Sequence, residues 1–197
     1  MEFQIAGSLI LLLFYGCYFA KMARQRRRGI QTGQMGRGKT GTPRYIELSL
    51  KAVSCLVPAV EAVSIALDTS LLGTTARAAG LLLGGAGTLV FMISVMTMRD
   101  SWRAGVPKED KTELVTGGIY QISRNPAFLG FDLVYIGIGM MFFNWILWIV
   151  SCLGMILFHL QIVNVEEDFL LEAYGDEYLS YKKRVCRYFG RRAQARR

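Results

Sequence analysis

The sequence has one histidine and no clustered cysteines, and both shortages limit the chemistry that it can carry. His159 is the only histidine among 197 residues. The four cysteines lie far apart, at Cys17, Cys55, Cys152 and Cys186. A His-rich metal site is therefore excluded, and neither a zinc site nor a disulfide framework is indicated. We expect no metal.

Acidic residues are absent from the segment 21–45, which is rich in lysine and arginine. Its cations are Lys21, Arg24, Arg26, Arg27, Arg28, Arg37, Lys39 and Arg44. A nucleic-acid partner would require a folded basic domain, and the sequence contains no such pattern. The net charge of +8 therefore indicates a topology signal with some attraction to anionic lipid head groups.

Charged residues are also scarce in five long apolar blocks, in a chain that is 52% hydrophobic. The blocks cover about 4–20, 46–67, 76–98, 127–143 and 145–165. A helix needs about 20 apolar residues to span a bilayer. We therefore predict an all-α polytopic membrane protein, a single membrane domain of about five transmembrane helices. Glu47, Lys51 and Glu61 interrupt the second block, and the spacing of Glu47 and Lys51 predicts a local ion pair at the end of that span.

The basic residues between the blocks predict the orientation in the membrane. The cation-rich segments are 21–45, 99–126 and 166–197, whereas the two other links are almost uncharged. Under the positive-inside rule these three segments are cytoplasmic, so the N-terminus lies outside and the C-terminus lies in the cytoplasm. The first block precedes its charges and lacks a cleavage pattern, so we interpret it as a span rather than a secretory signal. The tail after Tyr181 is expected to be a helix on the membrane surface with a frayed end.

The segment from Gly33 to Thr40 reads GQMGRGKT and matches the phosphate-binding pattern G-x-x-x-x-G-K-[ST]. That loop works only between a buried strand and a helix, and no strand pattern precedes it here. A flexible glycine-rich linker produces such a match by chance. We therefore do not expect nucleoside triphosphate binding.

Small residues recur every four positions in the third block, at Ala76, Gly80, Gly84 and Thr88. This spacing places them on one helix face. The pattern favours close packing against another helix. The alternative is a groove that leaves room for a lipid tail, and the sequence leaves both interpretations open.

The last two blocks form a hairpin with polar residues at its ends. Arg124, Asn125 and Pro126 open the hairpin, and Glu166 and Glu167 close it. Two helices of this length cross a bilayer and return. The arginine and the two carboxylates are therefore expected to meet at one membrane face, around one shared cavity.

Ionisable residues within the spans are further site candidates, because charge inside a bilayer is costly. Asp132 either faces the polar site or bonds to a neighbouring helix, and the sequence does not separate these possibilities. For His159 an interhelical hydrogen bond is the simpler interpretation. Together with Trp102, these residues are our candidates for contacts with a substrate.

Specific motifs surround the hairpin. They read LVTGGIYQISRNPAFLG over 114–130, EEDFL over 166–170 and YGDEYLSY over 174–181. In combination they resemble the isoprenylcysteine carboxyl methyltransferase family, and related phospholipid methyltransferases share the pattern. The resemblance covers about 100–197, while the first three blocks match only in being apolar.

The resemblance implies an integral membrane enzyme that uses S-adenosylmethionine, with the cofactor enclosed by the final hairpin and the cytoplasmic segments beside it. It implies that Arg124 and Glu167 lie at the catalytic edge. The residues that it implies for cofactor binding are Leu114, Val115, Tyr120, Asn125, Pro126, Phe128 and Glu166. Active members usually have histidine at the position of Asn125 and tyrosine at that of Phe128. These departures bear on the substrate more than on the cofactor.

The chemistry of methyl transfer from a sulfonium depends mainly on holding the reactants in the right geometry. The positive sulfur favours aromatic faces and carboxylates, and the candidates for these contacts are Trp102, Tyr120, Phe128 and Glu166. Arg124 stays protonated and cannot act as a base, but it can bind a carboxylate through two hydrogen bonds. A carboxylate acceptor needs no base, whereas an amine acceptor must lose a proton, to Glu167 or Asp132.

We therefore predict methylation of an amphiphilic lipid or prenylated acceptor that is dissolved in the membrane. The active site is expected at the cytoplasmic face, where the soluble cofactor is available. Two alternatives remain, namely an NADPH-dependent enzyme like the membrane sterol reductases, and a non-catalytic lipid-binding relative. The small number of spans argues against a sterol pocket. None of these interpretations involves nucleic acid or a metal.

Overall fold

A computed structural model describes residues 1–36, 39–105 and 113–191. The helices are α1 (Glu2–Arg27), α2 (Gly41–Ala66), α3 (Thr74–Met98), α4 (Pro126–Met141), α5 (Trp145–Gln161) and α6 (Glu167–Arg184). Shorter elements are the 3₁₀ turns η1 (Arg99–Ser101) and η2 (Gly118–Gln121), and the π-helical segment η3 (Ile162–Glu166). Two isolated bridges are the only β pairing among the described residues. The prediction of an all-α protein is confirmed.

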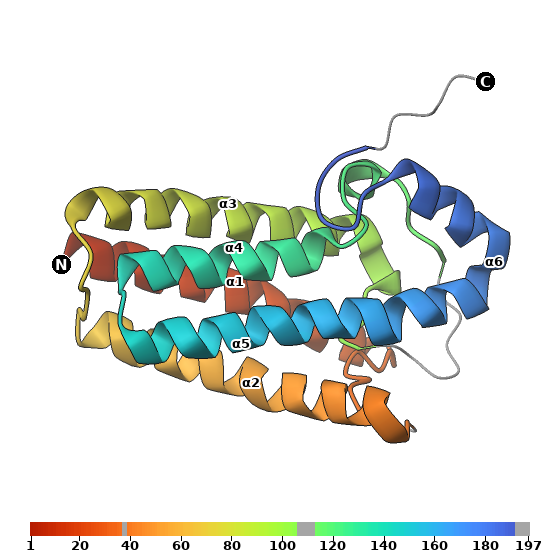
Figure 1. Ribbon diagram of the computed structural model, residues 1–197, viewed down its shortest axis with the longest axis horizontal. Helices are drawn as coiled ribbons and strands as arrows, with labels where there is room; N and C mark the ends of the chain where they lie inside the picture. Colours follow the sequence, from red (N-terminus) through yellow and green to blue (C-terminus); the bar gives the residue numbers. More distant parts are fainter. Residues whose placement is uncertain (37–38, 106–112, 192–197) are drawn as a thin grey trace.

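The helices form one elongated bundle. Figure 1 shows α1 to α5 along the long axis of the molecule, with α6 and the C-terminal segment at the end opposite the N-terminus. In the described part of the chain, four helical stretches are long and apolar enough to cross a membrane, and they are Glu2–Arg27, Gly41–Ala66, Thr74–Ser101 and Trp145–Arg184. α4 is apolar but has only 16 residues, or about 24 Å. The protein is a polytopic membrane protein, as predicted.

Glycines bring α3 and α4 into close contact. A Cβ atom on Gly87 would lie 2.7 Å from the Gly130 carbonyl oxygen, and one on Gly80 would lie 2.5 Å from that of Gly137. Real side chains do not fit at such distances, so glycine permits this approach. Thr88, in the same stripe, donates its hydroxyl to the Gly84 carbonyl at 2.9 Å. The stripe therefore serves helix packing, and α4 occupies the space that a lipid tail would need.

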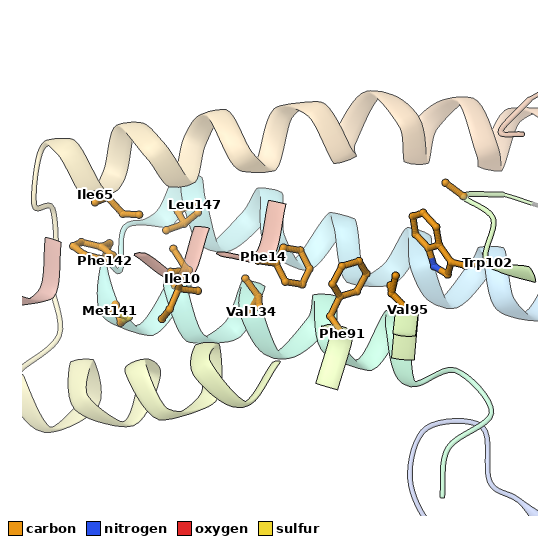
Figure 2. Close-up of a cluster of buried hydrophobic side chains, with 12 residues drawn as sticks. Ile10, Phe14, Ile65, Phe91, Val95, Trp102, Val134, Met141, Phe142 and Leu147 are labelled. Atoms are coloured by element: carbon orange, nitrogen blue, oxygen red, sulfur yellow. The ribbon is translucent and has the colours of Figure 1, made fainter. Parts of the chain in front are cut away.

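An aromatic core joins α1, α3 and α4. The ring centroids of Phe14 and Phe91 lie 4.6 Å apart, and Phe131 packs edge-on against Phe14 at 4.7 Å. Figure 2 shows the buried cluster extending along the bundle, from Phe142 at one end to Trp102 at the other. Each aromatic side chain removes a large apolar area from its surroundings. The core thus holds Trp102 against the helices at the end of the bundle where the polar residues gather.

The basic segment 21–45 is partly helical, because α1 continues to Arg27 and α2 begins at Gly41. The part between them docks on the chain that follows α3. The Gln34 amide donates to the Ala104 carbonyl at 2.8 Å, and the Ala104 amide donates to the Thr32 carbonyl at 2.9 Å. The fully buried Gln25 side chain donates to the Trp102 carbonyl at 2.9 Å. Two segments remote in sequence thus form one layer at this end.

The predicted ion pair between Glu47 and Lys51 is wrong. Glu47 is fully buried and pairs with Lys39. It also accepts hydrogen bonds from the Gly36 amide at 2.6 Å and the Gln161 side chain at 3.1 Å. These donors surround the carboxylate from the loop and from α5, so Lys51 is not needed as a partner. Lys39 of the phosphate-loop match is thus held by a carboxylate, and residues 37 and 38 of that match lie outside the described part.

The tail after Tyr181 is not one continuous surface helix. α6 ends at Arg184, and the residues up to 191 fold back over the start of α4. The Arg124 amide donates to the Cys186 carbonyl at 3.1 Å, and the Gly190 amide donates to the Ile122 carbonyl at 2.8 Å. After Arg184 the backbone leaves the helical pattern, and its polar groups pair instead within the turn and with the loop before α4. The remaining tail, 192–197, lies outside the described residues.

Candidate active site

One large cavity of about 1360 Å³ opens at the end of the bundle where α6 lies. Its walls come from α1, α2, the chain after α3, η2, and the ends of α4, α5 and α6. Most of the predicted site residues line it, namely Trp102, Leu114, Val115, Tyr120, Arg124, Asn125, Phe128 and Glu166. Pro126, Asp132, His159 and Glu167 are not among its lining residues. The structure therefore brings together residues that are separated by more than fifty positions in the sequence.

Arg124 is held rigidly at the cavity wall. Its side chain is 3% exposed. Nη1 donates to the Tyr178 hydroxyl at 2.7 Å and lies 3.1 Å from Glu167 Oε1, while Nε donates to the Val185 carbonyl at 3.1 Å. Nη2 takes part in none of these contacts. A guanidinium that is fixed in this way keeps one edge for an anionic group in the cavity.

Glu167 lies behind Arg124 and anchors three cations. Besides Arg124, it accepts hydrogen bonds from Lys182 at 2.8 Å and from Arg187 at 2.8 and 3.2 Å. Burial opposes the charged form, but the hydrogen bonds from Arg187 and Lys182 outweigh it and lower the pKa of Glu167 to about 2. A carboxylate this acidic and this fully paired is a poor proton acceptor. The geometry therefore favours Glu167 as the residue that orients Arg124.

The C-terminal turn and α6 hold the loop before α4. The Asn125 side-chain amide donates to the Arg187 carbonyl at 3.1 Å, and the Tyr181 hydroxyl donates to the Tyr120 carbonyl at 2.6 Å. Pro126 occupies the first turn of α4, where a missing N–H costs nothing because that N–H has no helical partner. These contacts fix the loop residues that face the cavity.

Glu166 also lines the cavity, at the end of the π-helical segment. The residue is half-buried. Burial and the nearby carboxylate of Glu47 raise the pKa of Glu166 to about 7, although Lys39 acts in the opposite direction. A cation bound in the cavity would stabilise the ionised form. π-Helical turns occur often at functional sites, and this one ends with Glu166 close enough to the Tyr120 hydroxyl to affect it electrostatically.

Two candidate residues lie elsewhere. The exposed His159 ring bonds through Nδ1 to the Tyr188 hydroxyl at 2.6 Å, with the two rings stacked at 6.0 Å. Asp132 is half-buried, and its Oδ1 is buried with no hydrogen-bond partner among the described residues. Neither side chain reaches the cavity wall. The structure therefore separates both from the residues around Arg124.

Sequence reasoning missed the partners of Glu167. Lys182 and Arg187 lie in the tail that is predicted as a helix on the membrane surface, and no periodic spacing links them to Glu167. Tyr178 and Tyr181 belong to the YGDEYLSY motif, but nothing in its spacing pairs them with Arg124 or Tyr120. Their contacts depend on the kink at Gly175, whose φ of 51° lies in the left-handed region.

The cavity has two chemically different parts. The polar end holds Arg124, Asn125 and Glu166, whereas the rest is an apolar arm between α1 and α2, lined by residues such as Leu12, Phe19 and Pro58. Leu12 and Phe19 are 71% and 61% exposed, so this arm is open on the side that faces the lipid. In the described ranges, no group of three or more His, Cys, Asp or Glu residues could hold a metal ion. The arrangement suits a polar, charged ligand and an apolar one that meet in one space.

Comparisons with known proteins support the resemblance. The phospholipid methyltransferase family matches residues 75–177, from α3 into α6. A protein-S-isoprenylcysteine O-methyltransferase of Rattus norvegicus is 34% identical over 114 residues, which are 57% of this chain and 40% of that protein. The enzyme of the same name from Schizosaccharomyces pombe is 35% identical over 72 residues, 36% of this chain and 30% of that protein.

A probable protein-S-isoprenylcysteine O-methyltransferase of Oryza sativa subsp. indica is 28% identical over 108 residues, 54% of this chain and 56% of that protein. The matched parts thus cover less than two thirds of the relatives' own lengths. The family match covers more than half of this chain and includes every residue placed around Arg124 from α4, α5 and the loop between α3 and α4. On this evidence the chain belongs to the phospholipid methyltransferase family.

Proposed function

We propose that the protein is an S-adenosylmethionine-dependent methyltransferase that acts on an amphiphilic acceptor dissolved in the membrane. The observation that carries this proposal is the single cavity that joins a charged end to an apolar arm. A water-soluble donor and a lipid-like acceptor can enter such a space from their own phases. A soluble enzyme pocket would not need an arm that opens between exposed apolar side chains.

The polar end fits the cofactor that the family implies. Among the described residues, the neutral Gln161 side chain hydrogen-bonds to the Glu166 carboxylate, and Tyr120 and Phe128 offer aromatic surface in the same cavity. The carboxylate and the aromatic rings both stabilise a positive sulfonium or amino group. The fixed guanidinium of Arg124 can bind a carboxylate. S-adenosylmethionine, when bound, supplies an electrophilic methyl group, and these residues hold and orient it.

The apolar arm fits the acceptor. It follows α2 from Lys51 to Ala66, a distance of about 22 Å at 1.5 Å per residue. Lys51 has no ion-pair partner among the residues that the structure describes, and it lines the arm. An acidic head group would find this cation and an apolar wall together. We therefore favour a carboxylate acceptor, which needs no base, in keeping with the O-methyltransferase names of the relatives.

The active site would then lie at the cytoplasmic face. The ends of α1, α2 and α3 that carry the basic residues gather at the same end of the bundle as α6 (Figure 1). By the positive-inside rule that end is cytoplasmic, which places the N-terminus outside. The cofactor is made in the cytoplasm, so this orientation gives it direct access.

The test is a methylation assay with purified protein in detergent and labelled S-adenosylmethionine. A prenylated cysteine with a free carboxylate and phosphatidylethanolamine, which presents an amine, are offered as acceptors. We expect labelled methyl ester from the first. Glu166→Gln should weaken donor binding at least tenfold, whereas Glu172→Gln, an exposed acid on α6, should not. Labelled phosphatidylethanolamine instead of labelled methyl ester would show that the acceptor group is an amine rather than a carboxylate.

Donor binding is measured in parallel by thermal shift. If S-adenosylmethionine does not stabilise the protein and no acceptor is labelled, the proposal fails. Stabilisation by NADPH instead would support an enzyme like the sterol reductases. Binding of lipid without donor binding or methylation would support a non-catalytic relative.

A further inference from the structure

A buried charge network links the N-terminal half of the chain to the cavity. At its centre Glu47 has no solvent exposure. Its carboxylate pairs with Lys39, accepts the Gly36 amide at 2.6 Å and accepts Gln161 Nε2 at 3.1 Å. Burying a carboxylate is costly unless donors surround it, and here the loop before α2 and helix α5 supply them. Glu47 lies outside the segment that matches the family.

The network reaches Glu166 through Gln161, whose side chain lies within hydrogen-bonding reach of both carboxylates. Gln161 is the last residue of α5, and the π-helical segment that carries Glu166 begins with the next residue. The wider π turn changes the direction of the side chains that follow it. Ile46, next to Glu47, packs against Val165, next to Glu166. The start of α2 therefore supports the turn that directs Glu166 into the cavity.

We propose that Glu47 and Lys39 are positioning residues, which hold Gln161 and the π-helical segment and set the charge environment of Glu166 for a cationic donor. The inference rests on the proposed function, because it concerns the same donor site. It assigns a role to a segment that the family match does not cover. A purely structural anchor would hold the loop without affecting how Glu166 responds to charge.

The charges around Glu166 predict opposite effects for the two residues. Glu47 raises the pKa of Glu166 and Lys39 lowers it. The other groups that face it are the Tyr120 hydroxyl from η2 and the Tyr178 hydroxyl from α6, while Arg103, Glu113 and Arg124 line the same cavity. None of these groups changes when Glu47 or Lys39 is replaced. A difference between the two variants in the pH dependence of donor binding therefore reports the charges of Glu47 and Lys39.

The experiment measures S-adenosylmethionine affinity against pH for the full-length protein in detergent. Affinity should fall as pH falls through the pKa of Glu166, because the protonated form cannot bind a cation. Glu47→Gln removes a negative charge and leaves Lys39 unpaired, so this decline should move to lower pH. Lys39→Gln removes a positive charge, so the decline should move to higher pH. Each displacement should be at least about half a pH unit, because charges several ångströms apart are screened less in a buried network than in water.

Two controls separate charge from folding. Arg44→Gln removes an exposed cation from the first turn of α2 and should leave the pH dependence unchanged. S-adenosylhomocysteine, which lacks the sulfonium charge, should bind with a weaker pH dependence and smaller differences between variants. If Glu47→Gln does not fold, Lys39→Gln alone still tests the direction of the displacement.

The outcomes are distinct. Wild-type protein that binds neither ligand at any pH would overturn the proposed function and this inference with it. Wild-type binding with unmoved pH profiles in both variants would overturn the inference alone. So would equal losses of affinity for both ligands at every pH, because they would indicate a purely structural role.

Discussion

The buried carboxylate of Glu167 makes the clearest prediction about stability. Replacing it by glutamine removes one negative charge and leaves its three cationic partners, of which Arg124 is almost fully buried. Arg124 keeps its hydrogen bonds to Tyr178 and Val185, so most of its buried donors still have acceptors. The main loss is therefore electrostatic, since the shape of the site is preserved.

The magnitude follows from the pKa of Glu167, which is about 2 in the folded protein instead of the usual 4.5. Each tenfold change in an acid constant corresponds to about 1.4 kcal/mol, so the charged form contributes about 3 kcal/mol to folding. Because folding lowers this pKa, the contribution is complete above pH 4.5 and is lost as the pH falls towards 2. Breaking a buried ion pair in other proteins costs about 3–5 kcal/mol, a similar figure.

The assay is thermal unfolding in detergent as a function of pH. At neutral pH, Glu167→Gln should lower the unfolding midpoint by about 6–12 °C, since 1 kcal/mol corresponds to about 2–4 °C for a protein of this size. The difference from wild type should shrink below about pH 4. Asp168→Asn, the exposed neighbour, should cause almost no change. An equal effect of the two variants, or a difference that is independent of pH, would refute the reasoning.

Three further predictions follow from the packing. Gly137→Leu should lower the unfolding midpoint and the folded yield, because its Cβ would lie 2.6 Å from Gly84 Cα, and the expected cost is about 1–3 kcal/mol or more. The control Gly85→Leu, whose Cβ would have no atom within 4 Å, should change neither quantity. Equal folded yields of the two variants would contradict this prediction. Gly16→Leu fills open space in the apolar arm. It should raise the KM for the acceptor about tenfold at constant donor affinity, since the new side chain competes with the apolar chain of the acceptor. A reduced donor affinity would contradict this prediction. Gln25→Met should lower the free energy of unfolding by about 1–3 kcal/mol, because the Trp102 carbonyl loses a buried donor. An unchanged midpoint in thermal unfolding would show that this hydrogen bond does not stabilise the fold.

The helices were predictable because their signal is local. Long apolar runs separated by basic segments indicate spanning helices whatever the tertiary contacts, and the stripe that includes Gly80 and Gly84 indicated close packing. The ends were less predictable. α1 extends beyond its apolar run to Arg27, because a helix that leaves the membrane can continue among cations without losing backbone hydrogen bonds.

The charge partners were the least predictable part of the site. An i, i+4 spacing suggested that Glu47 binds Lys51, yet the fold brings Lys39 and Gln161 to it from other elements. Local spacing is worth only a few tenths of a kcal/mol on an exposed helix. A carboxylate that becomes fully buried gains more from several fixed donors, and only the three-dimensional arrangement supplies them.

The position of Glu166 shows why the two halves of the chain must be considered together. Glu166 is predicted as a site residue from the motifs of the last hairpin, which lies within the segment that matches the family. Its charge environment, however, includes Glu47 in α2, which also accepts a hydrogen bond from Gln161. If Glu47 positions Glu166 as proposed, two relatives with the same hairpin motifs but different residues at the start of the second helix should differ in donor affinity at a given pH. Under this proposal the hairpin motifs define the family, while the start of the second helix sets the pH at which a member binds the donor.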